Sequence, residues 1–337
     1  MISKKSLLNK LEKLNIPNFN SFKKEFNNFN SSKDILYDAN IKVFQDSSIN
    51  HKKRLSFLKK INLLCTTQEL FFCSAHNLTL SIKVSREIGI TKNLVDDSHR
   101  AINLWKKIIN EDLAINGLIF SYIDLGLIYS DNNLFQLSLK YFSKAEILLS
   151  ESKNSYNPSV KLYVAKAVVY NQLKDYKKAL YFYEKVLKKA KKNKDMMTMI
   201  PVLINNADMI LEGKNDFKKA KSKSLEALKL SDKVNDNIYK PYIYKTLGQS
   251  YLYIKEYKNA EKYLKLSIDS FKKIQALKMI PQAIFDLGVL YYEEKKYEKA
   301  EIIFKRAIKK NKTIKNYSLD IEAVKQLSKI YKRNNKN

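Results

Sequence analysis

The sequence predicts an all-α solenoid in which one helix-turn-helix unit is repeated along the chain. The unit is clearest in residues 286–308, where apolar residues follow the spacing of an amphipathic helix, a polar break and a second amphipathic helix. The first helical face carries Leu287, Gly288 and Tyr291, and the second carries Tyr297, Ala300, Phe304 and Ala307. Because the break between the two helices is short, we expect the second helix to pack back on the first.

The positions that mark this unit recur at a nearly constant step. The marker on the first helix is Tyr129, Tyr170, Leu211, Tyr251, Tyr291 and Tyr331, so successive markers are 41, 41, 40, 40 and 40 residues apart. A second marker, at the start of the second helix, keeps the same step through Phe135, Tyr176, Phe217, Tyr257 and Tyr297. A fixed period of this size over five copies indicates a repeat array.

The order Leu, Gly and Tyr followed by aromatic, Ala, aromatic and Ala resembles the tetratricopeptide repeat (TPR). The resemblance covers residues 113–337 clearly and residues 51–112 faintly. It implies a right-handed solenoid whose first helices line a concave groove. Two features depart from the family: the usual period is ~34 residues, and the usual late proline is missing. The longer repeats resemble those of Rap-type bacterial peptide receptors and kinesin-light-chain-type adaptors.

The chain is expected to contain three regions. Residues 1–50 read as an N-terminal helical bundle or cap, residues 51–112 as degenerate TPR-like repeats, and residues 113–337 as five repeats closed by a capping helix. Outside the clear repeats, helices are expected over residues 3–14, 19–29, 32–46, 93–110 and 313–332. No glycine precedes Gly89 and no recognition-helix pattern is present, so a DNA-binding helix-turn-helix is not expected in this region.

Prolines and glycines add detail to the repeats. Each repeat's first helix is expected to start at a proline, because a proline in the first turn loses no helical hydrogen bond. These prolines are Pro158, Pro201, Pro241 and Pro281. Gly126, Gly248 and Gly288 are expected where the first helix approaches the second closely.

The charge and the cysteines bear on partners and location. The chain has 63 Lys and Arg against 34 Asp and Glu, a net charge of +29, which favours an acidic partner: nucleic acid, an anionic membrane surface or an acidic protein face. A compositional bias towards Asn, Ile, Tyr and Lys is the alternative explanation for this charge.

Cys65 and Cys73 lie in apolar surroundings and are expected to be reduced. With no signal core and no apolar run long enough to span a bilayer, the sequence predicts a cytoplasmic protein.

The sequence shows no enzyme pattern. Its three histidines, His51, His76 and His99, lie outside the clear repeats, and no phosphate loop, nucleophile elbow or zinc-site spacing is present. We therefore expect a non-enzymatic protein with no cofactor and no metal.

A binding role is the main hypothesis, because a solenoid presents an extended surface to a partner. In TPR proteins the resemblance places contact positions six and two residues before the Tyr marker and one after it. The candidate site residues are Asn171, Asn205, Met209, Lys245, Gln249, Phe285, Val289, Lys325 and Lys329. Asn205 and Gln249 would bond a peptide backbone, since an amide both donates and accepts, and the lysines would take a carboxylate. The alternative is that these are ordinary solvated positions.

Two other functions stay open. A nucleic-acid-binding solenoid would use the lysine pairs of the second helices, such as Lys177–Lys178 and Lys218–Lys219, on the convex side. A sensory TPR array that partners a signalling enzyme is the third hypothesis.

Overall fold

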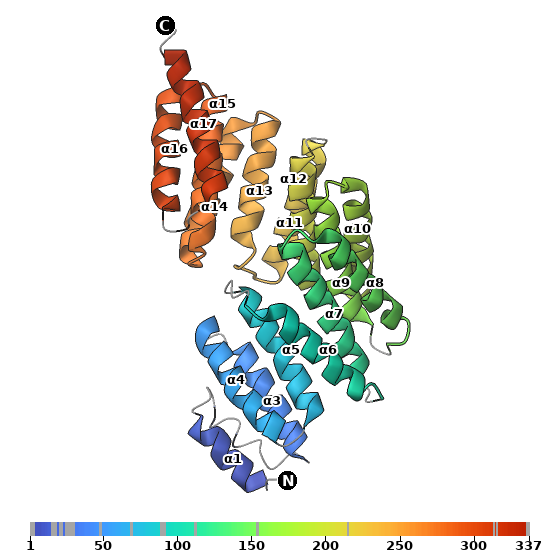
Figure 1. Ribbon diagram of the computed structural model, residues 1–337. Coiled ribbons are helices and arrows are strands. Elements are labelled where there is room, and N and C mark those ends of the chain that lie inside the picture. Colours follow the sequence, from blue (N-terminus) through green and yellow to red (C-terminus); the bar gives the residue numbers. More distant parts are fainter. Residues whose placement is uncertain are drawn as a thin grey trace. The chain divides into compact units, whose positions relative to one another are not determined.

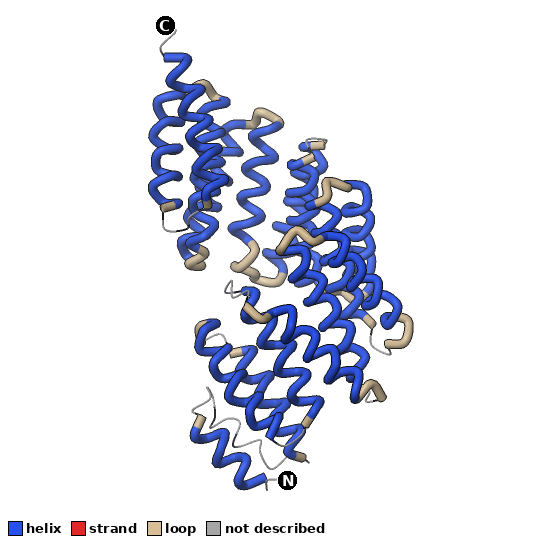
Figure 2. The backbone as a smooth tube through the Cα atoms, in the orientation of Figure 1, coloured by secondary structure: helices blue, strands red, loops and turns tan. Residues whose placement is uncertain are grey.

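The computed structural model has an all-α fold in which successive helices form antiparallel hairpins (Figures 1 and 2). It describes residues 4–14, 19, 23, 31–46, 49–67, 70–87, 92–110, 113–152, 155–213, 216–312, 314 and 316–334. No strand occurs among these residues. The predicted all-α solenoid is confirmed.

The chain divides into two compact units, residues 1–173 and residues 174–337. Unit 1 contains α1 (Lys4–Lys13), α3 (Ser32–Gln45), α4 (His51–Thr67), α5 (Phe71–Glu87), α6 (Leu94–Lys107), α7 (Ala114–Asp131), α8 (Phe135–Leu149) and α9 (Tyr156–Gln172). Unit 2 contains α10 (Tyr176–Lys192), α11 (Met196–Glu212), α12 (Phe217–Lys233), α13 (Lys240–Tyr253), α14 (Tyr257–Lys273), the short 3₁₀ helix η2 (Leu277–Met279), α15 (Ile280–Glu293), α16 (Tyr297–Asn311) and α17 (Tyr317–Asn334).

The helices expected outside the clear repeats can be compared with these bounds. Those over 3–14, 32–46, 93–110 and 313–332 correspond to α1, α3, α6 and α17. The helix expected over 19–29 lies outside the described residues, apart from positions 19 and 23. None of the described helices is long and apolar enough to cross a membrane.

Each hairpin is held together by close packing of its two helices. A β-carbon on Gly288 would lie 2.7 Å from Phe304 Cδ1, and one on Gly248 would lie 2.6 Å from Leu264 Cγ. Phe304 and Leu264 are both fully buried. The packing role predicted for these glycines is therefore confirmed.

The tight turns use left-handed residues other than glycine. Lys255 has φ 62° and follows α13; its N–H donates to the Leu252 carbonyl at 2.9 Å, and the Glu256 N–H donates to the Tyr251 carbonyl at 2.9 Å. This pair of bonds is the Schellman arrangement, which satisfies the last carbonyls of the helix. The left-handed residues among those described are Asn93, Asn133, Lys174, Lys194, Asn235, Lys255, Gln275 and Lys295.

The prediction that Pro201 starts a helix was wrong. Pro241 and Pro281 do lie at the first positions of α13 and α15, but Pro201 lies inside α11, which starts at Met196. Asp195 sets this earlier start, because its carboxylate accepts the Thr198 N–H at 2.9 Å and so caps the helix.

The prediction that Cys65 and Cys73 are reduced was also wrong. The structure joins them in a disulfide across the connection from α4 to α5. Their Cα atoms are 5.6 Å apart, within the range that a disulfide requires, and burial alone does not reveal such proximity. The cysteines therefore no longer support the predicted cytoplasmic location, because disulfides are uncommon there.

We expect Gly288→Leu to lower the free energy of unfolding by about 1–3 kcal/mol, because the new side chain would overlap Phe304. A circular-dichroism melt checks this, with Glu298→Leu on the exposed face of α16 as the matched control. Equal melting temperatures for the two variants would contradict the packing role of Gly288.

Candidate functional site

The first helices of unit 2 bring most of the predicted site residues onto one face. Helix α13 lies between α11 and α15 and contacts both (Figure 1). Two of the predicted residues are nearly buried, Met209 at 3% exposure and Phe285 at 8%. Asn205, Gln249 and Val289 are partly buried. We call the positions on α11, α13, α15 and α17 the first-helix face of unit 2.

Three of the other predicted residues differ from these five in exposure or in the unit to which they belong. Lys325 and Lys329 lie exposed on α17, where Lys325 Nζ is 3.9 Å from Glu322 and Lys329 donates to Gln326. Asn171 is partly buried near the end of α9 and belongs to unit 1.

Lys245 is engaged within the protein. Its Nζ lies 3.3 Å from Asp208 Oδ2, and the hydroxyl of Thr246 donates to the other oxygen of Asp208 at 2.7 Å. The Lys245 side chain is 15% exposed. Burial acts to lower the pKa of Lys245, but the carboxylates of Asp208, Asp286 and Glu212 outweigh burial and raise it. Lys245 therefore stays charged and lies among acidic groups.

Gln249 is also engaged, through Asp286 of α15. Gln249 Nε2 donates to Asp286 Oδ2 at 2.9 Å, and Gln282 donates to Asp286 Oδ1 at 3.1 Å. Burial raises the pKa of the Asp286 carboxyl, while Lys245 and the two amides act to lower it. The network therefore links α13 to α15 and supports the shape of the face.

Two amides on α11 have no such partner. The Asn205 side chain forms no hydrogen bond with the described residues and is partly buried. The neighbouring Asn206 is fully buried, and both polar atoms of its amide lack a partner. An unpaired buried amide such as that of Asn206 is unusual in folded proteins. The partly buried amide of Asn205 is the one of the two that could meet a ligand.

Unit 1 contains a cavity that the sequence analysis missed. Its volume is about 500 Å³. Its walls come mainly from the first helices α3, α5, α7 and α9. The aromatic wall residues are Tyr37, Phe44, Phe72, His76, Trp105 and Phe120, and polar ones include Thr79, Asn116, Asp124, Asn157 and Lys161. We call it the unit 1 cavity.

The aromatic side chains of the cavity pack on one another. The rings of Tyr37 and His76 have centroids 4.6 Å apart, and Phe72 meets Trp105 edge-on at 5.3 Å. The indole N–H of Trp105 donates to the Thr79 hydroxyl at 3.2 Å. Burial lowers the pKa of His76 to about 4, so its imidazole is neutral near pH 7. The repeat signature decays over residues 51–112, so the fixed period did not place the α3, α5 and α6 side chains of this cavity beside those of α7 and α9.

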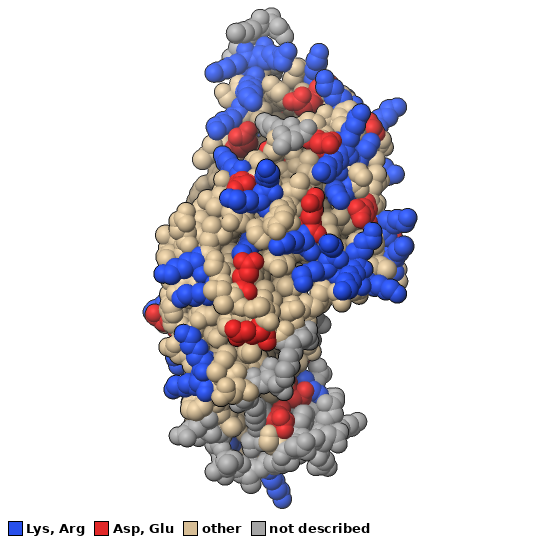
Figure 3. Space-filling model, turned by 90° about the vertical axis from the view of Figure 1, so that its right-hand side faces the viewer, with Lys and Arg blue, Asp and Glu red and all other residues tan. Residues whose placement is uncertain are grey.

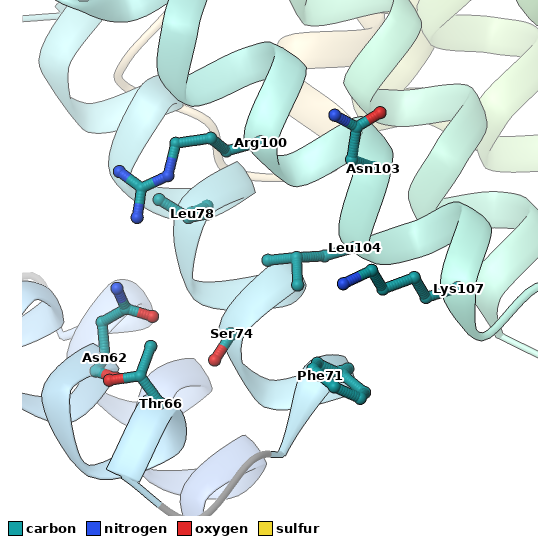
Figure 4. A pocket seen from close by; sticks show the side chains of 9 residues that line it. All are labelled: Asn62, Thr66, Phe71, Ser74, Leu78, Arg100, Asn103, Leu104 and Lys107. Carbon is teal, nitrogen blue, oxygen red and sulfur yellow. The ribbon is translucent and has the colours of Figure 1, made fainter.

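A second, smaller cavity of about 320 Å³ lies among α4, α5 and α6. Figure 4 shows Asn62 and Thr66 on α4, Phe71, Ser74 and Leu78 on α5, and Arg100, Asn103, Leu104 and Lys107 on α6. Lys107 Nζ lies 5.2 Å from the Phe71 ring centroid. No group of His, Cys, Asp and Glu suited to a metal ion occurs within the described ranges.

Basic side chains are widely spread over the surface. Figure 3 shows many Lys and Arg side chains on one face, with fewer Asp and Glu among them. Lys177, Lys178, Lys218 and Lys219 are exposed on the second helices α10 and α12. The surplus positive charge is thus present on second helices, whereas carboxylates surround Lys245 on the first-helix face.

Comparisons with known proteins identify the repeats. Residues 160–193 and 281–312 match the family model of the tetratricopeptide repeat. A search of curated proteins found no match. The chain therefore contains tetratricopeptide repeats over these residues, as the sequence indicated.

The solved structures with similar folds include two complexes. One is a Rap protein complexed with Competence and Sporulation Factor, with TM-score 0.65 and 16% identity over 86% of this chain and 80% of that chain. Another is NprR in complex with its cognate peptide NprX, with TM-score 0.59 and 14% identity over 90% of this chain and 84% of that chain. The fold thus resembles that of Rap-type regulators.

A third similar structure is a signal-transduction ATPase with a tetratricopeptide-repeat sensor, PH0952 from Pyrococcus horikoshii. Its TM-score is 0.69 with 18% identity, and the match covers 97% of this chain. This chain spans 49%, about half, of that protein's length.

We expect Lys245→Met to cost about 1–3 kcal/mol of unfolding free energy, because it leaves the Asp208 carboxylate without its ion-pair partner. Adding Asp208→Asn should recover part of the loss, since the carboxamide still accepts from Thr246 without a charge. Urea unfolding of Lys245→Met, Asp208→Asn and the double variant measures this. If the loss in the double variant equals the sum of the two single losses, the pair is not coupled.

We expect His76 to make stability pH-dependent. Its pKa is lowered from 6.5 to about 4 in the folded state, so the unfolded chain binds the proton first and stability falls as pH falls between these values. The loss between about pH 7 and about pH 5 should be about 2 kcal/mol. His76→Phe should reduce this loss in urea unfolding; parallel pH curves for the variant and the wild type would contradict it.

Proposed function

We propose that this chain is a non-enzymatic TPR scaffold or regulator. Its ligand would be an extended peptide, or a helix of a partner protein, bound along the first-helix face of unit 2. The observation that carries the proposal is the partly buried, unpartnered amide of Asn205 beside apolar Met209. An amide at such a place can donate to a peptide carbonyl and accept from a peptide N–H.

The neighbouring helices would complete the binding surface. Gln249 and Lys245 lie on α13, and Phe285 and Val289 lie on α15, so polar positions on α13 lie next to apolar positions on α15. Main-chain hydrogen bonds supply affinity to an extended peptide, while side-chain pockets supply specificity. The complex of NprR with its cognate peptide, a protein that shares this fold, supports a peptide ligand here.

The charges on this face refine the ligand that we propose. Because Lys245 already pairs with Asp208 and lies near Asp286 and Glu212, it is poorly placed to hold an acidic residue of the ligand. We therefore assign recognition to Asn205 and Val289, with the buried Met209 and Phe285 as the apolar floor beneath them. Lys325 and Lys329 are exposed cations on α17, and their weak surface contacts with Glu322 and Gln326 would give way to a ligand carboxylate.

A nucleic-acid partner is the second candidate, favoured by the net charge of +29 and by the exposed lysines of α10 and α12. Affinity capture from the host lysate, with and without nuclease and over a salt series, separates the two. A protein or peptide that withstands nuclease supports the peptide function. Nucleic acid recovered alone, and lost steeply with salt, supports the second candidate.

We expect Asn205→Ala to weaken binding of the captured partner about tenfold, because one buried hydrogen bond is lost. The matched control is Lys218→Ala with Lys219→Ala on α12, which should leave the affinity unchanged. Isothermal titration of both variants with the purified partner measures the difference. If the lysine variant weakens binding and Asn205→Ala does not, the binding surface lies on the second helices instead.

A further inference from the structure

We propose that the unit 1 cavity is a second ligand site, which binds an aromatic group carrying a hydrogen-bond donor, such as a tyrosine or tryptophan side chain. The site is built entirely within residues 1–173. It therefore does not depend on the peptide function proposed for unit 2.

The walls of the cavity fit an aromatic ring. Phe72 and Trp105 form an edge-to-face pair, and Phe120 and Phe44 add further rings from α7 and α3. Aromatic rings prefer edge-to-face and offset contacts, which these walls offer to an entering ring. A volume of about 500 Å³ lies within the usual range of ligand pockets.

Asp124 supplies the polar end of the site. Its side chain is 3% exposed, and Lys161 Nζ donates to Oδ1 at 2.8 Å. The other oxygen, Oδ2, is buried and has no hydrogen-bond partner within the part of the chain that the structure describes. A buried carboxylate oxygen without a donor is costly, so a ligand that brings an O–H or N–H to Oδ2 gains a charge-assisted hydrogen bond.

Two neighbouring contacts fix this end of the cavity. Lys161 Nζ also lies 5.1 Å from the centroid of the Phe120 ring, which positions the ion pair beside an aromatic wall. A β-carbon on Gly117 would lie 2.5 Å from the indole of Trp105, so helix α7 and the indole are in close contact. The acceptor and the rings thus belong to one packed structure, and an aromatic group with a polar tip matches both.

The wild-type chain can be titrated with N-acetyl-tyrosine amide and with N-acetyl-phenylalanine amide, which differ only in the phenolic hydroxyl. Trp105 is the single tryptophan of the chain and lines the cavity, so its fluorescence reports on this site. We expect the tyrosine amide to bind about tenfold more tightly, from the bond to Asp124. Equal affinities, or no change in Trp105 emission with either probe, would overturn the proposal.

The variant Asp124→Ala should abolish the preference for tyrosine while the phenylalanine amide still binds. Thr246→Ala, at the equivalent position of a repeat in unit 2, is the control and should keep the preference. If Asp124→Ala does not fold, the comparison of the two probes on the wild type decides alone.

A third probe, 4-methylphenol, shows whether the bound aromatic group belongs to a peptide or to a free phenolic compound. Tighter binding of the tyrosine amide than of 4-methylphenol would identify a residue of a peptide. Equal binding of the two would identify a free phenolic compound, and both results retain the site. Binding of neither compound would overturn it.

Discussion

The close approach of two helices within each hairpin is the constraint on which the rest of the structure depends. Where a glycine faces the second helix, as at Gly248 and Gly288, a large side chain such as Leu264 or Phe304 fills the space. In the α11–α12 hairpin the equivalent positions are Asp208 and Ser224. Asp208 there bonds to Lys245 and Thr246 of the next hairpin. The polar network of unit 2 therefore arises where one repeat departs from the packing rule.

One position of the repeat carries four of the polar groups discussed above. Asp124, Asn206, Thr246 and Asp286 all lie five residues before the marker of their first helix. Thr246 and Asp286 are bonded to adjacent helices, so they hold the solenoid together. Asp124 and Asn206 keep unpartnered buried atoms instead. The same position thus bonds neighbouring helices together in some hairpins, whereas in others it keeps a polar atom that a ligand could bond.

Much of the fold could be predicted because hairpin packing imposes a fixed period on the sequence. The aromatic markers and Gly288 follow from the step alone. Contacts between neighbouring repeats could not be predicted, because they depend on which rotamer a side chain such as Lys245 adopts. Cys65, Cys73 and the cavity residues Phe72, His76 and Trp105 lie where the period decays, so no register related these side chains to one another or to the cavity residues of α7 and α9.

The left-handed residues at the helix turns are positions where substitution could raise the stability of the fold. Lysine at Lys174, Lys194, Lys255 and Lys295 adopts a backbone conformation that disfavours any side chain with a β-carbon, whereas glycine adopts it freely. Lys255 and Lys295 lie seven residues after the packed glycines Gly248 and Gly288, and all four turn lysines lie outside the predicted contact positions. A thermostable scaffold could therefore be made by changing the turns alone, with the interior and both candidate ligand surfaces left as they are.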